Sequence, residues 1–185
     1  GSVPLKWSQS VDISQGSLIP PIHIHPDDAI NKAVFTAHMH LLHQLYGKMA
    51  VKMLSLVNDV SESNREFPLA KRFTELVGDN LLFHFNYNKE LKRADWKDRL
   101  MTLVTSSMTL DFSLLTNAPK KHKKQTQPTI AQSTMVRVNC LDSLDRTNSV
   151  QSTLAAHLYP AMLSSINPTT PPSPLLLQKF LSTMQ

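Results

Sequence analysis

The sequence predicts an α/β fold with a mainly parallel sheet flanked by helices. Short apolar segments at 49–57, 81–86 and 134–138 have the length and composition of strands. Segments with apolar residues at helical spacing lie among them, at 26–46 and 63–77. A tight polar loop then joins the last strand to a further helix-like run. Strands that alternate with helices in this way favour a layered α/β domain.

The first 26 residues predict two short extended pieces. Segment 3–9 is apolar, and Pro4 excludes a helix interior there, so we expect an edge strand with Trp7 in the core. The connection 10–26 is rich in turn residues. Within it, apolar and histidine residues alternate at 22–25, as in a short strand.

The helix at 26–46 has clear start and stop signals. An acidic pair lies at its positive end, and Gly47 is a plausible stop. Its apolar residues recur at helical spacing, so we expect one face to be buried. The residues of that face are Ile30, Val34, Ala37, Leu41 and Leu45.

The middle of the chain alternates between strand and helix. Segment 49–57 predicts a strand, 63–77 a helix and 81–86 a buried strand. Segment 87–105 is polar at first and then helical. Near the C-terminal end we expect a helix at 147–162 that Pro160 ends or kinks.

The loop after the strand at 134–138 carries the chemistry. Cys140 is followed six residues later by Arg146 and then by Thr147. A Cys that opens such a loop has its thiolate stabilised by backbone N–H groups and the helix N-terminus, so it can act as a nucleophile. The arginine offers a planar fork for a phosphate, and the threonine hydroxyl can assist the leaving thiolate. This predicts attack of sulfur on a phosphomonoester. The alternative is a buried inert thiol with Arg146 in a surface ion pair.

The run 139–148 closely resembles the signature of the Sac-domain phosphoinositide phosphatases, approximately R-x-N-C-x-D-C-L-D-R-T-N. Arg137 occupies the matching upstream position, whereas Ser143 replaces the usual second Cys of the family. Segment 1–9 resembles a second element, R-G-S-x-P-L-x-W-x-Q. Segment 83–96 resembles the F-D-F-H-H-E-to-W stretch, with the acidic and His positions altered.

The resemblance implies that residues 1–185 are part of a Sac catalytic domain. The P-loop would be 139–148, with a basic loop at 117–128 and a Pro-rich segment at 166–174. The implied activity is hydrolysis of a ring phosphate of phosphatidylinositol phosphates through a phosphocysteine. One alternative is an inactive Sac-like module that binds lipids or acts as a scaffold. A weaker one is a protein-tyrosine or dual-specificity phosphatase, which usually has His before the Cys and Gly in the loop.

The catalytic residues expected are Cys140 as nucleophile, Arg146 as phosphate ligand and Thr147 as thiolate partner. Asp142 is the better candidate for protonating the leaving oxygen or positioning water. Asp145 is expected to brace the arginine or cap the helix, and the family motif leaves open which Asp is the acid. The other residues expected at the substrate are Arg137, Asn139, Leu141, Ser143, Leu144 and Asn148 in and before the loop, and Lys120, Lys121, Lys123 and Lys124 in the basic loop.

The basic loop could bind lipid or could simply be a solvated surface loop. Its lysines would contact anionic lipid headgroups, at about 1 kcal/mol per basic residue near the membrane. The alternative is a solvated polar loop. The net charge of +5 and the pI near 9.4 suit an anionic partner without identifying it. We expect no nucleic acid, because no aromatic residues are interleaved with the lysines to stack on bases.

Composition sets further limits. One Cys cannot form an intrachain disulfide, which fits a reducing compartment. No apolar run approaches the roughly 20 residues that a membrane helix needs. We therefore expect a cytoplasmic protein, either peripheral at cytosolic membrane faces or anchored there by segments outside this chain. Five histidines between His23 and His43 raise the question of a metal, but no Cys or well-spaced carboxylate completes a ligand set. We expect neither a metal nor a cofactor.

Overall fold

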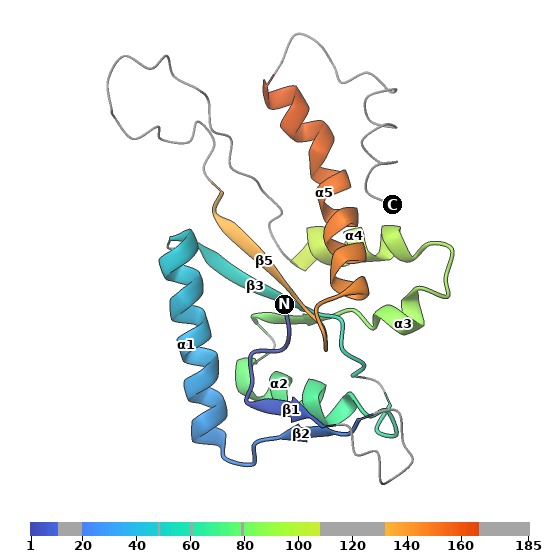
Figure 1. The fold of residues 1–185 in the computed structure, drawn as a ribbon. Helices are drawn as coiled ribbons and strands as arrows, with labels where there is room; N and C mark the ends of the chain where they lie inside the picture. Colours follow the sequence, from blue (N-terminus) through green and yellow to red (C-terminus); the bar gives the residue numbers. More distant parts are fainter. Residues whose placement is uncertain (11–19, 48, 60, 79, 108–131, 167–185) are drawn as a thin grey trace.

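The computed structural model describes residues 1–10, 20–47, 49–59, 61–78, 80–107 and 132–166 (Figure 1). It is a mixed α/β structure, as the sequence predicts. In chain order its elements are β1 Trp7–Gln9, β2 Ile22–Ile24, α1 Asp28–Tyr46, β3 Ala50–Ser55, α2 Phe67–Val77, β4 Leu82–His84, α3 Tyr87–Glu90, α4 Trp96–Ser107, β5 Thr134–Asn139 and α5 Asp145–Ile166. The basic loop with Lys120, Lys121, Lys123 and Lys124, and the Pro-rich segment beyond Ile166, lie outside the described residues.

Three strands form a parallel sheet in the order β4-β3-β5. Ser55 lies in register with His84 on one side and with Asn139 on the other. The carboxyl ends of all three strands therefore meet at one edge of the sheet. At that edge Ser2 forms a parallel bridge with Cys140, so the N-terminus lies beside the end of β5 (Figure 1).

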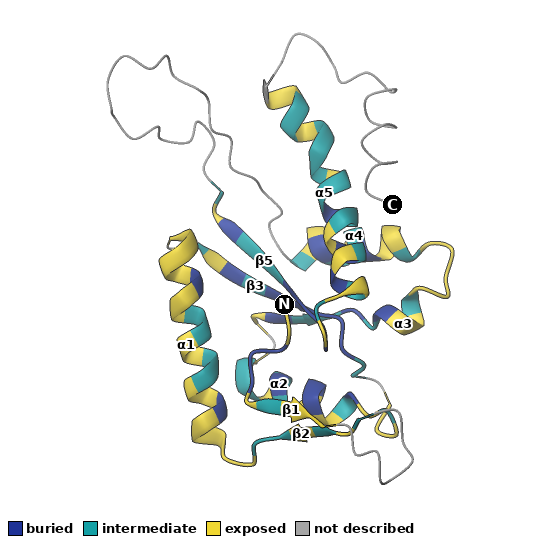
Figure 2. Ribbon diagram, in the orientation of Figure 1, coloured by how far each residue is buried: buried dark blue, intermediate teal, exposed yellow. Residues whose placement is uncertain are grey.

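The sheet is covered on both faces, as a parallel sheet requires. Alternate residues of β3 point to opposite sides, so Met53 packs with Phe73 of α2, whereas Leu54 packs with residues of α4 and α5. All three side chains are fully buried. Figure 2 shows this burial concentrated along the strands and on the helix sides that face them. Cys140 belongs to the cluster on the α4 and α5 side.

The N-terminal segment forms a separate antiparallel ribbon of β1 and β2. Trp7 pairs with Ile24, and the indole N–H of Trp7 donates to the Val3 carbonyl oxygen at 3.1 Å. Both residues pack against the core cluster that contains α1 and α2. The prediction of short extended pieces at both positions is confirmed.

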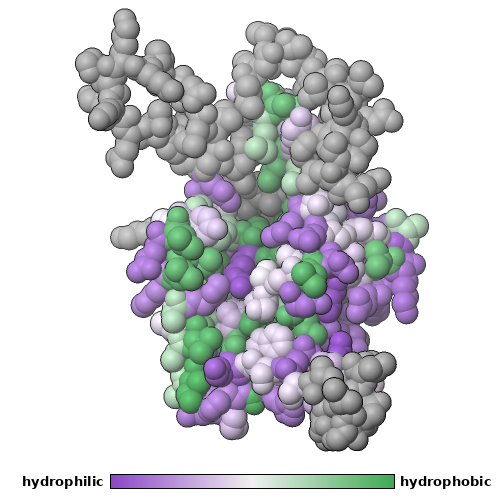
Figure 3. Space-filling model, in the orientation of Figure 1, coloured by the Kyte–Doolittle hydropathy of each residue, from purple (hydrophilic) through white to green (hydrophobic). Residues whose placement is uncertain are grey.

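Helix α1 starts where the sequence predicts, because the Asp27 carboxylate accepts the Ala29 N–H at 2.8 Å. It ends at Gly47, whose φ of 81° is a left-handed value that glycine adopts easily. The prediction of its buried face is wrong. Ile30, Leu41 and Leu45 are exposed, and Figure 3 shows apolar atoms gathered along the helix.

The reason is a polar residue. Asn31 is buried, and its side-chain amide donates to the carbonyl oxygens of His25 and Asp27. Its oxygen accepts the Lys6 N–H at 3.1 Å. These three hydrogen bonds dock α1 through its Asn31 side, and Leu42 follows on that side as the buried apolar residue. Hydrophobic periodicity alone could not identify this side.

Candidate functional site

The site is the loop between β5 and α5, at the carboxyl edge of the sheet. Cys140 is fully buried and directly follows β5. Its N–H donates to the Gly1 carbonyl oxygen at 3.0 Å, and the Asn139 carbonyl oxygen accepts the Leu56 N–H at 2.7 Å. The sheet therefore fixes the first residue of the loop from both sides. Helix α5 begins five residues later at Asp145.

Two donors point at the sulfur of Cys140. The Ser143 backbone N–H lies 2.9 Å from Sγ, and the Thr147 hydroxyl also lies 2.9 Å away. Ser143 has φ 64°, a left-handed value that is uncommon outside glycine. This conformation turns its N–H back toward the sulfur, and strain of this kind is typical of functional loops. These two hydrogen bonds hold the sulfur within the loop.

The carboxylate of Asp142 lies beside the sulfur, with Oδ1 at 3.5 Å from Sγ. The same oxygen accepts the Leu144 N–H at 3.1 Å. That backbone hydrogen bond, the contact with Cys140 and the charge of Arg146 together lower the pKa of Asp142 below its usual value, against a smaller opposing effect of burial. Asp142 is therefore ionised at neutral pH in this arrangement.

Arg146 is held by a residue that the sequence analysis missed. Its Nη2 and Nη1 donate to the two carboxylate oxygens of Glu66, at 2.7 and 2.9 Å. Burial works against ionisation of Glu66, but these bonds and the Asn58 N–H outweigh it and lower the pKa of that carboxyl. In turn Glu66 raises the pKa of Arg146. The hydrogen bond is the largest cause, the negative charge of Glu66 adds to it, and burial opposes both.

Glu66 lies 80 residues before Arg146 and immediately before α2. A carboxylate in that position suggests a helix cap, yet its side chain makes no capping bond. It is also buried, with 4% of its surface exposed. The only hint in the sequence is an acidic residue directly ahead of Phe67 and Pro68, where a cap would be expected.

The guanidinium of Arg146 keeps one edge available. Its planar group has five N–H bonds. Nη1 donates to Glu66 and, at 3.3 Å, to the Leu56 carbonyl oxygen, while Nη2 donates once to Glu66. The Nε–H and the second Nη2–H make no hydrogen bond within the described part of the chain. These two bonds share one edge, with the spacing that grips two phosphate oxygens.

Arg137 and Asn139 lie on the opposite face of β5 from Val138, and the cluster around Val138 also contains Cys140. The Arg137 Nη2 donates to the Ser2 carbonyl oxygen at 3.0 Å, and burial lowers the pKa of Arg137 to about 10. The fully buried Asn139 donates from its side chain to the Arg137 carbonyl oxygen. Both residues thus surround the root of the loop and do not contact the sulfur.

The remaining loop residues are spread around its rim. Leu141 is buried in the α1 and α2 cluster, whereas Leu144 is 60% exposed. Asp145 is exposed in the first turn of α5, where its charge suits the helix dipole, and the guanidinium beside it pairs with Glu66. Asn148 is exposed, and its N–H donates to the Leu144 carbonyl oxygen at 3.0 Å.

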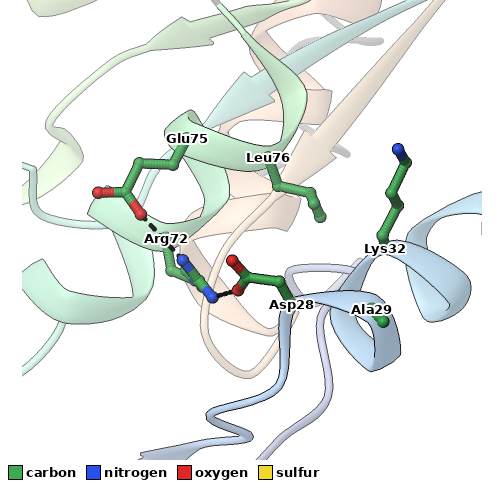
Figure 4. Close-up of a pocket in the computed structure, with 6 residues that line it drawn as sticks. All are labelled: Asp28, Ala29, Lys32, Arg72, Glu75 and Leu76. Carbon is green, nitrogen blue, oxygen red and sulfur yellow. Dashed lines mark hydrogen bonds and ion pairs between the residues drawn. The ribbon is translucent and has the colours of Figure 1, made fainter.

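The structure also has a pocket of about 360 Å³ away from this loop, between α1 and α2 (Figure 4). Arg72 forms ion pairs there with Asp28 and with Glu75, while Lys32 extends away from this group. The pocket shares no residue with the Cys140 loop. Among the described residues, no group of three His, Cys, Asp or Glu side chains could hold a metal ion. No described helix has the length and apolar character of a membrane span.

Comparison with known proteins shows the family of this chain. A family model described as SacI homology domain matches residues 1–101. Synaptojanin-2 of Homo sapiens is 30% identical over 181 residues, covering 93% of this chain and 11% of that protein. Phosphatidylinositol-3-phosphatase SAC1-B of Danio rerio is 31% identical over 168 residues, covering 84% of this chain and 25% of that protein.

SAC1-A of Danio rerio, also named as a phosphatidylinositol-3-phosphatase, is 32% identical over 170 residues, with 84% of this chain and 25% of that protein covered. The chain thus spans a quarter or less of the length of these relatives. The matched family region includes Glu66, and the pairwise likenesses cover most of the chain. The chain therefore belongs to the family of the SacI homology domain, together with the Sac1 phosphatases and the synaptojanins.

Proposed function

We propose that this chain carries the catalytic loop of a phosphoinositide phosphatase that removes a ring phosphate through a phosphocysteine. The observation that carries the proposal is the sulfur of Cys140 with two hydrogen-bond donors at 2.9 Å, in a strand–loop–helix arrangement. The free edge of Arg146 supplies the second requirement, a fork for the phosphate oxygens. Two relatives are named as phosphatidylinositol-3-phosphatases, which supports the substrate class.

The reaction proceeds in two displacements. The Cys140 thiolate attacks phosphorus, the bond between phosphorus and the ring oxygen breaks, and that oxygen takes up a proton from solvent water. Water then attacks the phosphocysteine, which releases inorganic phosphate and returns the thiolate. The Ser143 N–H and the Thr147 hydroxyl stabilise the sulfur anion in both steps. Arg146 stabilises the charge on the phosphate oxygens in the transition state.

Asp142 suits the second displacement. Its carboxylate is ionised, which is the state that a base for the attacking water requires. A proton donor for the ring oxygen would need the protonated acid, which the Leu144 N–H disfavours. Of the two roles expected from the sequence, the ionised state of the carboxylate favours the positioning of water.

The lipid substrate implies work at a membrane surface. We propose a peripheral protein at cytosolic membrane faces, with the four lysines of segment 117–128 as contacts to anionic headgroups. The net charge of +5 supports this assignment. The exposed side chain of Leu144, at the tip of the catalytic loop, is a further apolar contact available to a lipid surface.

A second candidate is a Sac-like module that binds phosphoinositides without turnover. It is favoured by the state of the loop, because the N–H groups of Ser143 and Leu144 already have acceptors inside the protein. A phosphate must compete with the Asp142 carboxylate for the second of these groups. A protein that never moves Asp142 would bind weakly and release no product.

The test is phosphate release from phosphatidylinositol phosphate vesicles by the full-length protein and by Cys140→Ser. We expect complete loss of release in the variant, with the fold retained. Ser149→Ala, in the same helix region but outside the loop, is the control and should retain activity. Release that persists in Cys140→Ser removes this residue from the mechanism. Vesicle binding without release by the wild type favours the binding module.

A further inference from the structure

The ion pair between Glu66 and Arg146 raises a question about the proposed site, because an arginine that is already paired must still bind phosphate. The pair is well shielded, with side-chain exposures of 6% and 15%. The bond pattern answers the question. Glu66 takes one N–H from each terminal nitrogen, on the end of the guanidinium that points away from Nε. The Nε edge is left for a ligand.

The pair also fixes the plane of the guanidinium. Two parallel hydrogen bonds to one carboxylate allow little rotation of a planar group. The Leu56 carbonyl oxygen adds a third contact, and Leu56 directly follows β3, next to the strand that ends at Asn139. Glu66 is itself held, because its Oε2 accepts the Asn58 N–H at 3.0 Å. The arginine is therefore anchored to the carboxyl edge of the sheet.

We infer that Glu66 is a positioning residue for the phosphate-binding arginine, which it orients so that the Nε edge of Arg146 faces the phosphate. This inference rests on the proposed function, in which Arg146 binds the phosphate. Glu66 acts through Arg146 and does not touch the substrate. If the guanidinium of Arg146 were turned from this orientation, it would lose one of its two hydrogen bonds to the phosphate. Most of the lost binding energy would appear in the transition state, where the charge on the phosphate oxygens is greatest.

The experiment is a double-mutant cycle in the full-length protein with Glu66→Gln, Arg146→Lys and the double variant. One readout is the affinity for tungstate, an oxyanion that binds without turnover. The other is phosphate release, separated into kcat and KM. We expect Glu66→Gln to weaken tungstate binding about tenfold and to lower kcat more than it changes KM, since one charge-assisted contact is lost.

In the Arg146→Lys background, Glu66→Gln should change tungstate affinity less than about twofold, because a lysine has no planar edge to orient. Glu75→Gln is the matched control, since it breaks a Glu–Arg pair on the surface of the same helix, α2. It should leave both readouts unchanged. If Glu66→Gln does not fold, Glu66→Asp keeps the charge and retracts the carboxylate by one methylene, and it should weaken tungstate binding too.

The outcomes separate the two proposals. If Glu66→Gln weakens tungstate binding equally in the wild type and in Arg146→Lys, its role is purely structural. That result would overturn the inference, whatever the phosphatase activity. The expected cycle in a protein that releases no phosphate would support the positioning role and overturn the proposed function. Failure of the wild type to bind tungstate, together with no phosphate release, would overturn both.

Discussion

Replacing Thr147 by valine isolates one hydrogen bond to the sulfur of Cys140. Thr147 is buried, at 3% exposure, and its hydroxyl donates to Cys140 Sγ at 2.9 Å. Valine has nearly the same shape, so the change removes the donor without opening a cavity. The Ser143 N–H remains on the sulfur. A hydrogen bond to a charged group contributes about 1.5–3 kcal/mol. Reaction at the sulfur should therefore slow by about 10- to 150-fold.

The assay is the rate of alkylation by iodoacetamide, followed by the mass of the peptide that carries Cys140. The chain has one Cys, so an alkylated cysteine peptide from this chain can come only from Cys140. The rate constant of phosphate release should fall by a similar factor. Thr153→Val is the matched control, because that hydroxyl lies in the same helix and donates only to the Ser149 carbonyl oxygen. Unchanged alkylation in a folded Thr147→Val protein would refute the role of this hydroxyl.

Three further predictions concern stability and oxidation. Phe73→Ala should lower the free energy of unfolding by about 3–5 kcal/mol, because Phe73 is fully buried between α2 and the sheet. Urea titrations measure this loss, and a value below about 1 kcal/mol would contradict the packing. The lowered pKa of Glu66 means that its stabilising effect is present above the unfolded value of about 4.3 and is lost as pH falls through the folded pKa. Unfolding free energies of wild type and Glu66→Gln should thus converge in acid, and curves that stay parallel would argue against the pair. Peroxide should inactivate Cys140 without an intrachain disulfide, since Ser143 replaces the second Cys of the signature; ready recovery with thioredoxin after prolonged peroxide would count against this prediction.

The parts of the fold that the sequence predicted well are the parallel strands. β3, β4 and β5 each lie within the range expected from their apolar runs, or extend one residue beyond it. These strands are buried on both faces, so their hydrophobicity alone identifies them. The start of α1 was also predictable, because Asp27 is a local capping signal. Signals of this kind need only a few neighbouring residues.

The errors come from contacts between distant residues. The docked side of α1 depends on Asn31, whose partners include Lys6, and a polar residue gives no hydrophobic signal. Helix α5 includes Pro160 and extends to Ile166, four residues beyond the expected end at 162. The missing N–H of Pro160 costs one bond, and the helix extends for six residues beyond it.

The candidate site shows the same division. Cys140, Arg146 and Thr147 were predictable because one short loop contains them all. From the sequence, Asp145 is expected to brace the arginine or to cap the helix, whereas the ion pair of the arginine in the structure is with Glu66. Sequence proximity favours a neighbour, but the first turn of α5 points Asp145 to solvent. Only the packing of α2 against the sheet brings Glu66 to the guanidinium.

The most direct test of the proposed mechanism is to trap the phosphocysteine. The full-length protein would be mixed with phosphatidylinositol phosphate labelled in the ring phosphate, quenched in denaturant at alkaline pH and digested, and the labelled peptide identified by mass spectrometry. The account predicts label on Cys140, no label in Cys140→Ser, and unchanged labelling in Thr153→Val. Label on another residue, or phosphate release that continues in Cys140→Ser, would contradict it.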